Sequence, residues 1–156
     1  MLDLAHAAPS GMNLQPWYFY VLNNLEKNRA IAMEVCERAK EQLAAKAKDA
    51  HDRGCSNFLF YDAPTVIYCC VPKGTGFTNE FDLGLAVENM MLFAQQNGFC
   101  TLPVGLAKKF GEDIIRKEIG IADEHDFFIA LCVGYRASDS GDAPKPRKEE
   151  YAKWIE

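Results

Sequence analysis

The residue pattern predicts an α/β domain, because stretches typical of strands and of helices alternate along the chain. Two continuously apolar runs, PTVIYCCV at 64–71 and FFIALCV at 127–133, are typical of strands covered on both faces. A third segment, residues 79–97, has a helical pattern that is apolar almost all round. Together these segments predict a sheet buried between helices.

The composition indicates one ordinary globular domain over residues 1–156, without internal repeats. A net charge of -5 argues against a nucleic-acid partner, which requires a basic face. No apolar run approaches the length of a membrane span, and the first residues lack the pattern of a signal peptide. The six cysteines form no C-x-x-C pair and no zinc-like ligand spacing, so we expect no metal site and a reduced, cytoplasmic protein.

The first part of the chain has the pattern of a helix, a strand and a long helix. Residues 1–8 resemble the end of a helix, and residues 17–22 predict a strand. Asn23 and Glu26 resemble a capping box that opens a helix to about residue 50. Apolar residues recur in that helix at every fourth position: Ile31, Val35, Ala39, Leu43 and Ala47.

The rest of the chain alternates strands and helices. In order, we expect a connector at 51–62, a strand at 64–71, a loop at 72–76, a helix at 79–97, a strand at 99–104, a helix at 106–119, a strand at 127–133 and a polar tail from 136. Gly98 is the expected stop of helix 79–97. The side chains expected to face inward from helix 106–119 are Phe110, Ile114, Ile115 and Ile119.

Helix 79–97 raises a question of burial. A helix that is apolar on every side must be covered all round, and the chain has few layers with which to cover it. A twofold partner would supply the missing cover, which predicts a homodimer. A central helix within a monomer is the alternative.

The stretch APSGMNLQPW, residues 8–17, holds more turn-forming and amide residues than a plain connector needs. Pro9 ends the first helix, and Gly11 keeps the turn thin, so that the backbone can approach a ligand. A capped helix-to-strand turn, with Trp17 in the core, is the alternative, and for Trp17 we prefer it.

The segment APSGMNLQPWYFYV resembles the signature of the nitroreductase family of FMN-dependent oxidoreductases. DAPTVIYCC resembles the next sheet strand of that family, and DLGLAVENMMLFAQQNGFCTLPVG resembles its central dimer helix and the following turn. IIRKEIGIADEHDFFIALCVGYRA resembles its last helix and strand, so the likeness covers nearly the whole chain. The resemblance implies an α+β sheet flanked by helices and an intertwined homodimer with two FMN sites at the subunit interface. We adopt this α+β class in place of the α/β class that alternation suggests.

The resemblance also implies roles for two segments. Ser10 and Asn13 would donate hydrogen bonds to the flavin, and Gln15 would fix the turn or contact the polyol. The turn TLPVG would face the reactive edge of the ring with backbone N–H groups; its residues in the expected site are Leu102, Pro103, Val104 and Gly105. An ordinary strand-to-helix loop is the alternative for this turn.

The chain departs from the family at its start. The family opens with a helix and an arginine-rich motif that holds the FMN phosphate, and neither precedes Met1 here. We therefore expect a truncated chain, a misplaced start or a shortened member. Lys145 and Arg147 match a later basic pair that also contacts the phosphate in relatives, although a solvated basic tail is the alternative.

The activity that the resemblance implies is hydride transfer from NAD(P)H through flavin N5 to a nitroaromatic, a quinone or a related acceptor, with no catalytic side chain. Phe58, Phe60 and Tyr61 could stack on such an acceptor, although core packing is the alternative. Two other activities stay open: a degenerate flavin-binding member without catalysis, or a relative that dehalogenates its substrate or fragments flavin.

Overall fold

The computed structural model describes residues 1–74, 76–137 and 146–155. Its centre is a four-stranded sheet in the order β1-β2-β4-β3, in which every neighbouring pair is antiparallel. The strands are β1 (Tyr18–Asn23), β2 (Thr65–Pro72), β3 (Cys100–Val104) and β4 (His125–Gly134). The α+β class is confirmed. The α/β class was wrong because alternation reports the order of elements and not the direction in which strands run.

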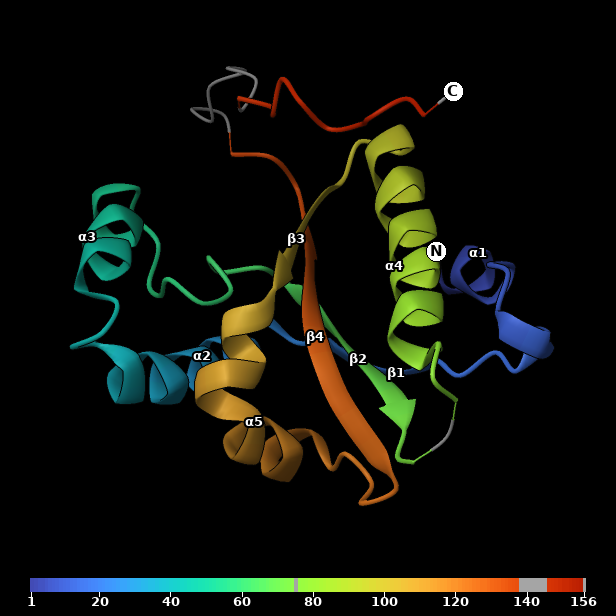
Figure 1. The fold of residues 1–156 in the computed structure, drawn as a ribbon. Helices are drawn as coiled ribbons and strands as arrows, with labels where there is room; N and C mark the ends of the chain where they lie inside the picture. Colours follow the sequence, from blue (N-terminus) through green and yellow to red (C-terminus); the bar gives the residue numbers. More distant parts are fainter. Residues whose placement is uncertain (75, 138–145, 156) are drawn as a thin grey trace.

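The helices lie in two layers, one on each side of the sheet (Figure 1). They are α1 (Leu2–His6), α2 (Leu25–Ala39), α3 (Ala44–Asp52), α4 (Asn79–Gln96) and α5 (Gly105–Ile119), with a short 3-10 turn at Gly11–Asn13. Figure 1 shows α1 and α4 on one side and α2, α3 and α5 on the other. Among the described helices, none combines the length and the apolar character that spanning a bilayer requires.

The apolar run in β2 supplies both cores, because successive side chains of a strand point to opposite faces. Val66, Tyr68 and Cys70 are buried in the cluster beneath α2 and α5. The residues between them, among them Ile67 and Cys69, are buried in the cluster beneath α1 and α4. The prediction that this strand is covered on both faces is confirmed.

Strand β4 is less completely covered than its apolar run predicts. Phe127, Ala130 and Leu131 are buried, but Phe128 and Ile129 are only partly buried against the cluster beneath α1 and α4. The sequence run of β4 is continuously apolar, like that of β2. The pairing of the two strands is also irregular here: Cys69 lies opposite Ile129 and Cys70 opposite Phe127, so Phe128 has no partner in β2.

The long helix expected to reach residue 50 is two helices. α2 ends at Ala39 and α3 begins at Ala44, so that Ala39, Ala50 and Phe58 pack together in a small third cluster. On a straight helix, eleven residues would separate Ala39 from Ala50 by about 16 Å. The cap is also one residue later than expected, since the side chain of Asn24 accepts the Lys27 N–H at 3.0 Å.

The two later helices have different covers. In α5, Ile114 and Ile115 are buried and Phe110 and Ile119 pack against the core, as predicted. α4 buries one face, whose members are Leu83, Ala86, Val87, Met90 and Ala94. On its remaining surface, Phe81 is 68% and Leu92 is 59% exposed within a single chain.

Candidate functional site

The loop after α1 has a strained backbone. Met12, Asn13 and Gln15 have φ angles of 51°, 57° and 49°, which is the left-handed region that side-chain-bearing residues rarely adopt. Each such residue costs of order 1 kcal/mol or more, and such residues concentrate at binding and catalytic sites. Tyr61 and Asp62 share this conformation elsewhere in the chain.

Contacts to the start of α4 hold this loop in place. The Gly11 N–H donates to Asp82 Oδ2 at 3.0 Å, and Thr78 Oγ1 donates to the same oxygen at 3.0 Å. Asp82 is only 2% exposed. A Cβ added at Gly11 would lie 2.7 Å from Thr78 Oγ1, so glycine permits the close approach. The close approach that Gly11 permits in this structure is therefore to the start of α4. The sequence patterns identified neither Asp82 nor Thr78.

Within the loop, the side chains close the turn on themselves. Ser10 Oγ accepts the Gln15 N–H at 2.9 Å, and Gln15 Nε2 donates to Asn13 Oδ1 at 3.2 Å. These contacts correspond to the turn-fixing role expected of Gln15. They leave the Ser10 hydroxyl proton and the Asn13 amide hydrogens as donors. Pro9 is exposed, and Trp17 packs against the core beneath α1 and α4, as preferred for it.

A second candidate segment is the junction of β3 and α5, which borders a cleft of about 780 Å³. The cleft is lined by Lys46, Asp49, Arg53, Phe58, Leu59, Tyr61, Leu102, Pro103, Val104, Gly105, Leu106 and Lys109. Val104 is the N-cap of α5 and makes no side-chain capping bond. The first backbone N–H groups of a helix have no partner within it, so this junction offers donors and a positive helix end to the cleft.

Two of the three aromatic residues expected to stack on the electron acceptor lie in the lining of this cleft. Phe58 and Tyr61 line it, although Phe58 is only 4% exposed. Phe60 does not line it: its side chain is 1% exposed and meets the ring of Tyr68 edge-on, with the centroids 6.3 Å apart. For Phe60 the placement is that of the core-packing alternative.

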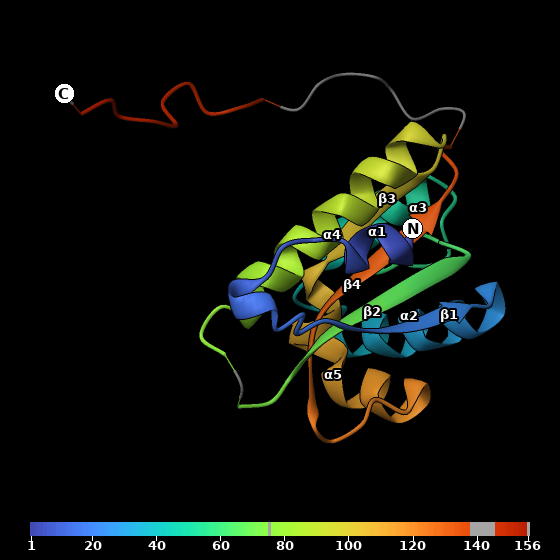
Figure 2. The same cartoon turned by 90° about the vertical axis from the view of Figure 1, so that its right-hand side faces the viewer.

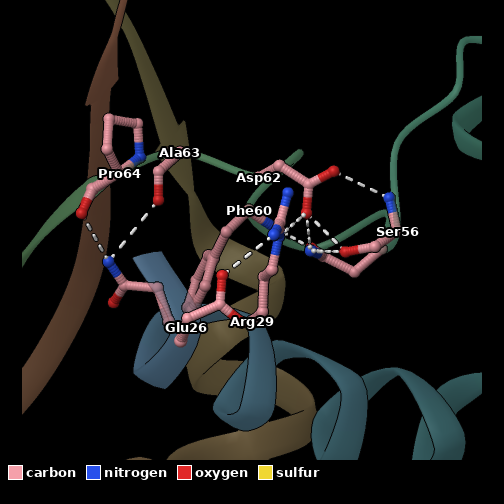
Figure 3. A network of polar contacts seen from close by, with 9 residues as sticks. Glu26, Arg29, Ser56, Phe60, Asp62, Ala63 and Pro64 are labelled. Carbon is pink, nitrogen blue, oxygen red and sulfur yellow. Dashed lines mark hydrogen bonds and ion pairs between the residues drawn. The ribbon is translucent and has the colours of Figure 1, made fainter. Parts of the chain in front are cut away.

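A polar network fixes the connector that carries Tyr61 (Figure 3). Asp62 accepts the Ser56 N–H at 2.8 Å, Arg29 Nε at 3.0 Å and Asn57 Nδ2 at 3.2 Å, and also the Ser56 hydroxyl. Burial raises the pKa of Asp62, but the bonds from Ser56 and Arg29 outweigh it, so the pKa lies below its ordinary value of 3.8. Nothing in the sequence pattern singled out these residues, because each alone is an ordinary loop or helix-surface residue.

The predicted site residues form two groups that do not meet within one chain. The strained loop lies beside α4, and the cleft opens among α3, β3 and α5, on the opposite side of the sheet (Figure 1). Arg147 is exposed in the segment 146–155, which extends away from the domain (Figure 2). Lys145 lies outside the described residues.

The comparison with protein families decides the classification. Residues 1–135 match the model of the Nitroreductase family. The chain belongs to the nitroreductase family. The sequence resemblance to this family is thereby confirmed over most of the chain.

Individual relatives of this nitroreductase-family chain are distant. An iodotyrosine deiodinase from Thermotoga neapolitana is 28% identical over an alignment of 153 residues, which covers 94% of this chain and 77% of the relative. Nitroreductase NfnB from Mycolicibacterium smegmatis is 23% identical over 86% of this chain and 71% of its own length. The crystal structure of a nitroreductase with bound FMN from Bacteroides fragilis has a TM-score of 0.77 at 21% identity, covering 99% of this chain and 84% of that one.

Proposed function

We propose that this protein is an FMN-dependent oxidoreductase that transfers hydride from NAD(P)H to a nitroaromatic, a quinone or a related acceptor. The observation that carries the proposal is the strained loop at 10–15, anchored to buried Asp82 within a nitroreductase-family chain. Three residues in the left-handed region cost stability, and such strain is typical of segments that contact a ligand. Contact with a cofactor accounts for this strain.

The residues of the loop and of the β3–α5 turn fit FMN in their chemistry. Bound FMN would supply a two-electron carrier that accepts a hydride from the nicotinamide and returns the electrons to the acceptor. Ser10 and Asn13 keep donors for its carbonyl and ring-nitrogen edges, and the uncapped amides at Gly105 and Leu106 supply further donors. Lys145 and Arg147 are the proposed partners of its phosphate.

The site requires two chains. The loop and the β3–α5 cleft lie on opposite sides of one sheet, so a single chain cannot present both to one flavin. The exposed Phe81 and Leu92 on α4 offer an apolar surface for a second copy. We therefore propose a homodimer, and light scattering should give twice the mass of the chain at micromolar concentration; a folded monomer would contradict it.

Absorbance spectroscopy tests the activity. Protein saturated with FMN should be yellow after gel filtration, and anaerobic NADH or NADPH should bleach it. Adding a nitroaromatic or a quinone should then restore the colour. Retained colour that neither nucleotide bleaches would favour the non-catalytic flavin-binding alternative, and a failure to retain FMN would overturn the proposal.

Arg147 has its own test. Because riboflavin lacks the phosphate, Arg147→Ala should weaken FMN binding strongly and riboflavin binding little. Equal losses for both ligands would show that Arg147 supports the fold and not the phosphate.

Reductive dehalogenation is a second candidate. It is favoured by the 28% identity to the iodotyrosine deiodinase over 94% of this chain. The test is release of iodide from 3-iodo-L-tyrosine by FMN-loaded protein under a chemical reductant. Iodide release that is faster than the reduction of nitroaromatics would favour this candidate over the first.

A further inference from the structure

The β3–α5 cleft concentrates positive charge in an acidic protein. Its lining holds three basic side chains, Lys46, Arg53 and Lys109, against one acidic side chain, Asp49, whereas the whole chain carries a net charge of -5. Asp49 is already paired with Arg53, at 3.0 Å from its Nε. The excess charge therefore belongs to the two lysines.

Neither lysine is neutralised by the part of the chain that the structure describes. Lys46 lies on α3 and is exposed, and no carboxylate there is within ion-pair distance of it. Lys109 lies on α5, and its ammonium is 5.2 Å from the ring centroid of Phe110. By contrast Lys48, two residues after Lys46, is paired with Asp52 at 2.8 Å. Both lysines that line the cleft are therefore without a carboxylate partner in the part of the chain that the structure describes.

The start of α5 adds to this positive potential. Val104 caps the helix without a side-chain bond, and Gly105 and Leu106 of the first turn line the cleft. The N-terminus of a helix carries about half a positive charge and presents free N–H groups. The helix end, whose amides are the proposed donors to the flavin, therefore adds positive potential beside the two ammonium groups, and this potential suits an anionic oxygen.

The other walls of the cleft are apolar and fixed in place. Phe58, Tyr61, Leu102 and Pro103 present ring and aliphatic surface. The Asp62 network fixes the connector at the residue after Tyr61 (Figure 3), and both Tyr61 and Asp62 have a left-handed backbone. A preformed apolar wall beside cationic groups matches a flat ring that carries a negative charge.

We propose that the cleft binds the electron acceptor, and that the acceptor is a planar aromatic compound with a carboxylate held by Lys46 and Lys109. This inference rests on the proposed oxidoreductase function and names its substrate class. The phosphate of FMN is a second source of the same anionic chemistry. The experiment therefore distinguishes the acceptor's carboxylate from the cofactor's phosphate.

The test compares two acceptors that differ only in charge, 4-nitrobenzoate and 4-nitrobenzamide, with FMN-loaded protein. The double variant Lys46→Gln, Lys109→Gln should lower kcat/KM for 4-nitrobenzoate about tenfold, equivalent to about 1.4 kcal/mol, and leave that for 4-nitrobenzamide unchanged. Taking the ratio of each variant to the wild type cancels any intrinsic difference in how easily the two nitro groups are reduced. The loss should shrink at high salt, because the charges are exposed.

The matched control is Lys48→Gln, Lys117→Gln, which removes the same charge from the same two helices outside the cleft lining. Equal effects of the two double variants on 4-nitrobenzoate would overturn the proposal, because bulk charge would then explain them. Weaker binding of FMN but not of riboflavin in the cleft variant would also overturn it, since the lysines would then hold the phosphate.

Calorimetric titration of the FMN-loaded protein with benzoate and benzamide gives a readout that needs no turnover. Tighter binding of benzoate by the wild type, lost in the cleft variant and kept in the control, supports the cleft assignment even if neither nitro compound is reduced. In that case the oxidoreductase proposal fails alone. Equal binding of benzoate and benzamide overturns the cleft assignment whatever the turnover.

Discussion

Replacing Asp62 with Asn should destabilise the protein by about 2 kcal/mol. Asn tolerates the left-handed backbone that Asp62 adopts, with φ at 58°, so the change isolates the hydrogen bonds. One carboxylate oxygen becomes an NH₂ group, which cannot accept the bond that Ser56 N–H now donates. A hydrogen bond to a charged group contributes about 1.5–3 kcal/mol, and the partly exposed pair with Arg29 adds little to this.

Asp113 provides the matched control. It also joins two elements through an arginine, Arg38, but its side chain is 71% exposed, whereas that of Asp62 is 19% exposed. Asp113→Asn should therefore cost much less stability than Asp62→Asn. Urea unfolding followed by circular dichroism measures the stability of both variants. Their midpoints can be compared directly if the free energy of unfolding falls with urea concentration at the same slope in both. Free energies of unfolding that agree within about 0.5 kcal/mol for the two variants would refute the reasoning.

Three further predictions follow from named contacts. The cost of Asp62→Asn should depend on pH. Because the pKa of Asp62 in the folded protein lies below 3.8, its carboxylate stabilises the protein above the unfolded pKa, and this stabilisation is lost as the pH falls through the folded pKa. Urea unfolding of the wild type and the variant at pH 7, 5 and 3 should show the loss. Gly111→Ala should destabilise by about 1–3 kcal/mol, because its Cβ would lie 2.4 Å from Val35 Cγ2. Adding Val35→Ala should relieve that clash, so thermal unfolding of the double variant should show less than the summed loss. Gly11→Ala should weaken FMN binding in a fluorescence titration, because its Cβ would displace Thr78 and disturb the contact with Asp82; unchanged affinity would separate the loop from the cofactor.

The sequence predicted burial well and geometry less well. The apolar run in β2 and the inward stripe of α5 were correct, because the spacing of apolar residues reports which face is covered. The break between α2 and α3 was missed, because it depends on Ala50 and Phe58 packing together rather than on any local stop signal. Strand direction was missed for the same reason, since pairing is decided between segments distant along the chain.

In the candidate site, sequence motifs located the segments but not the residues that hold them. The loop and the β3–α5 turn were found from their resemblance to a family. Asp82 was hidden within an apolar helix and lies 71 residues from its partner Gly11. Asp62 draws its contacts from Arg29, 33 residues away, and from the nearby Ser56. Such long-range polar contacts have no periodic signature, so only the folded structure reveals them.

The placement of the strained loop and the cleft on opposite sides of one sheet has a genetic consequence for the proposed dimer. A chain defective only in the loop and a chain defective only in the cleft would each form dimers with two damaged sites. A hybrid of the two would combine one intact site with one that is doubly damaged. Mixing and refolding two inactive variants would thus regain activity by intersubunit complementation, and two variants of the same segment would not.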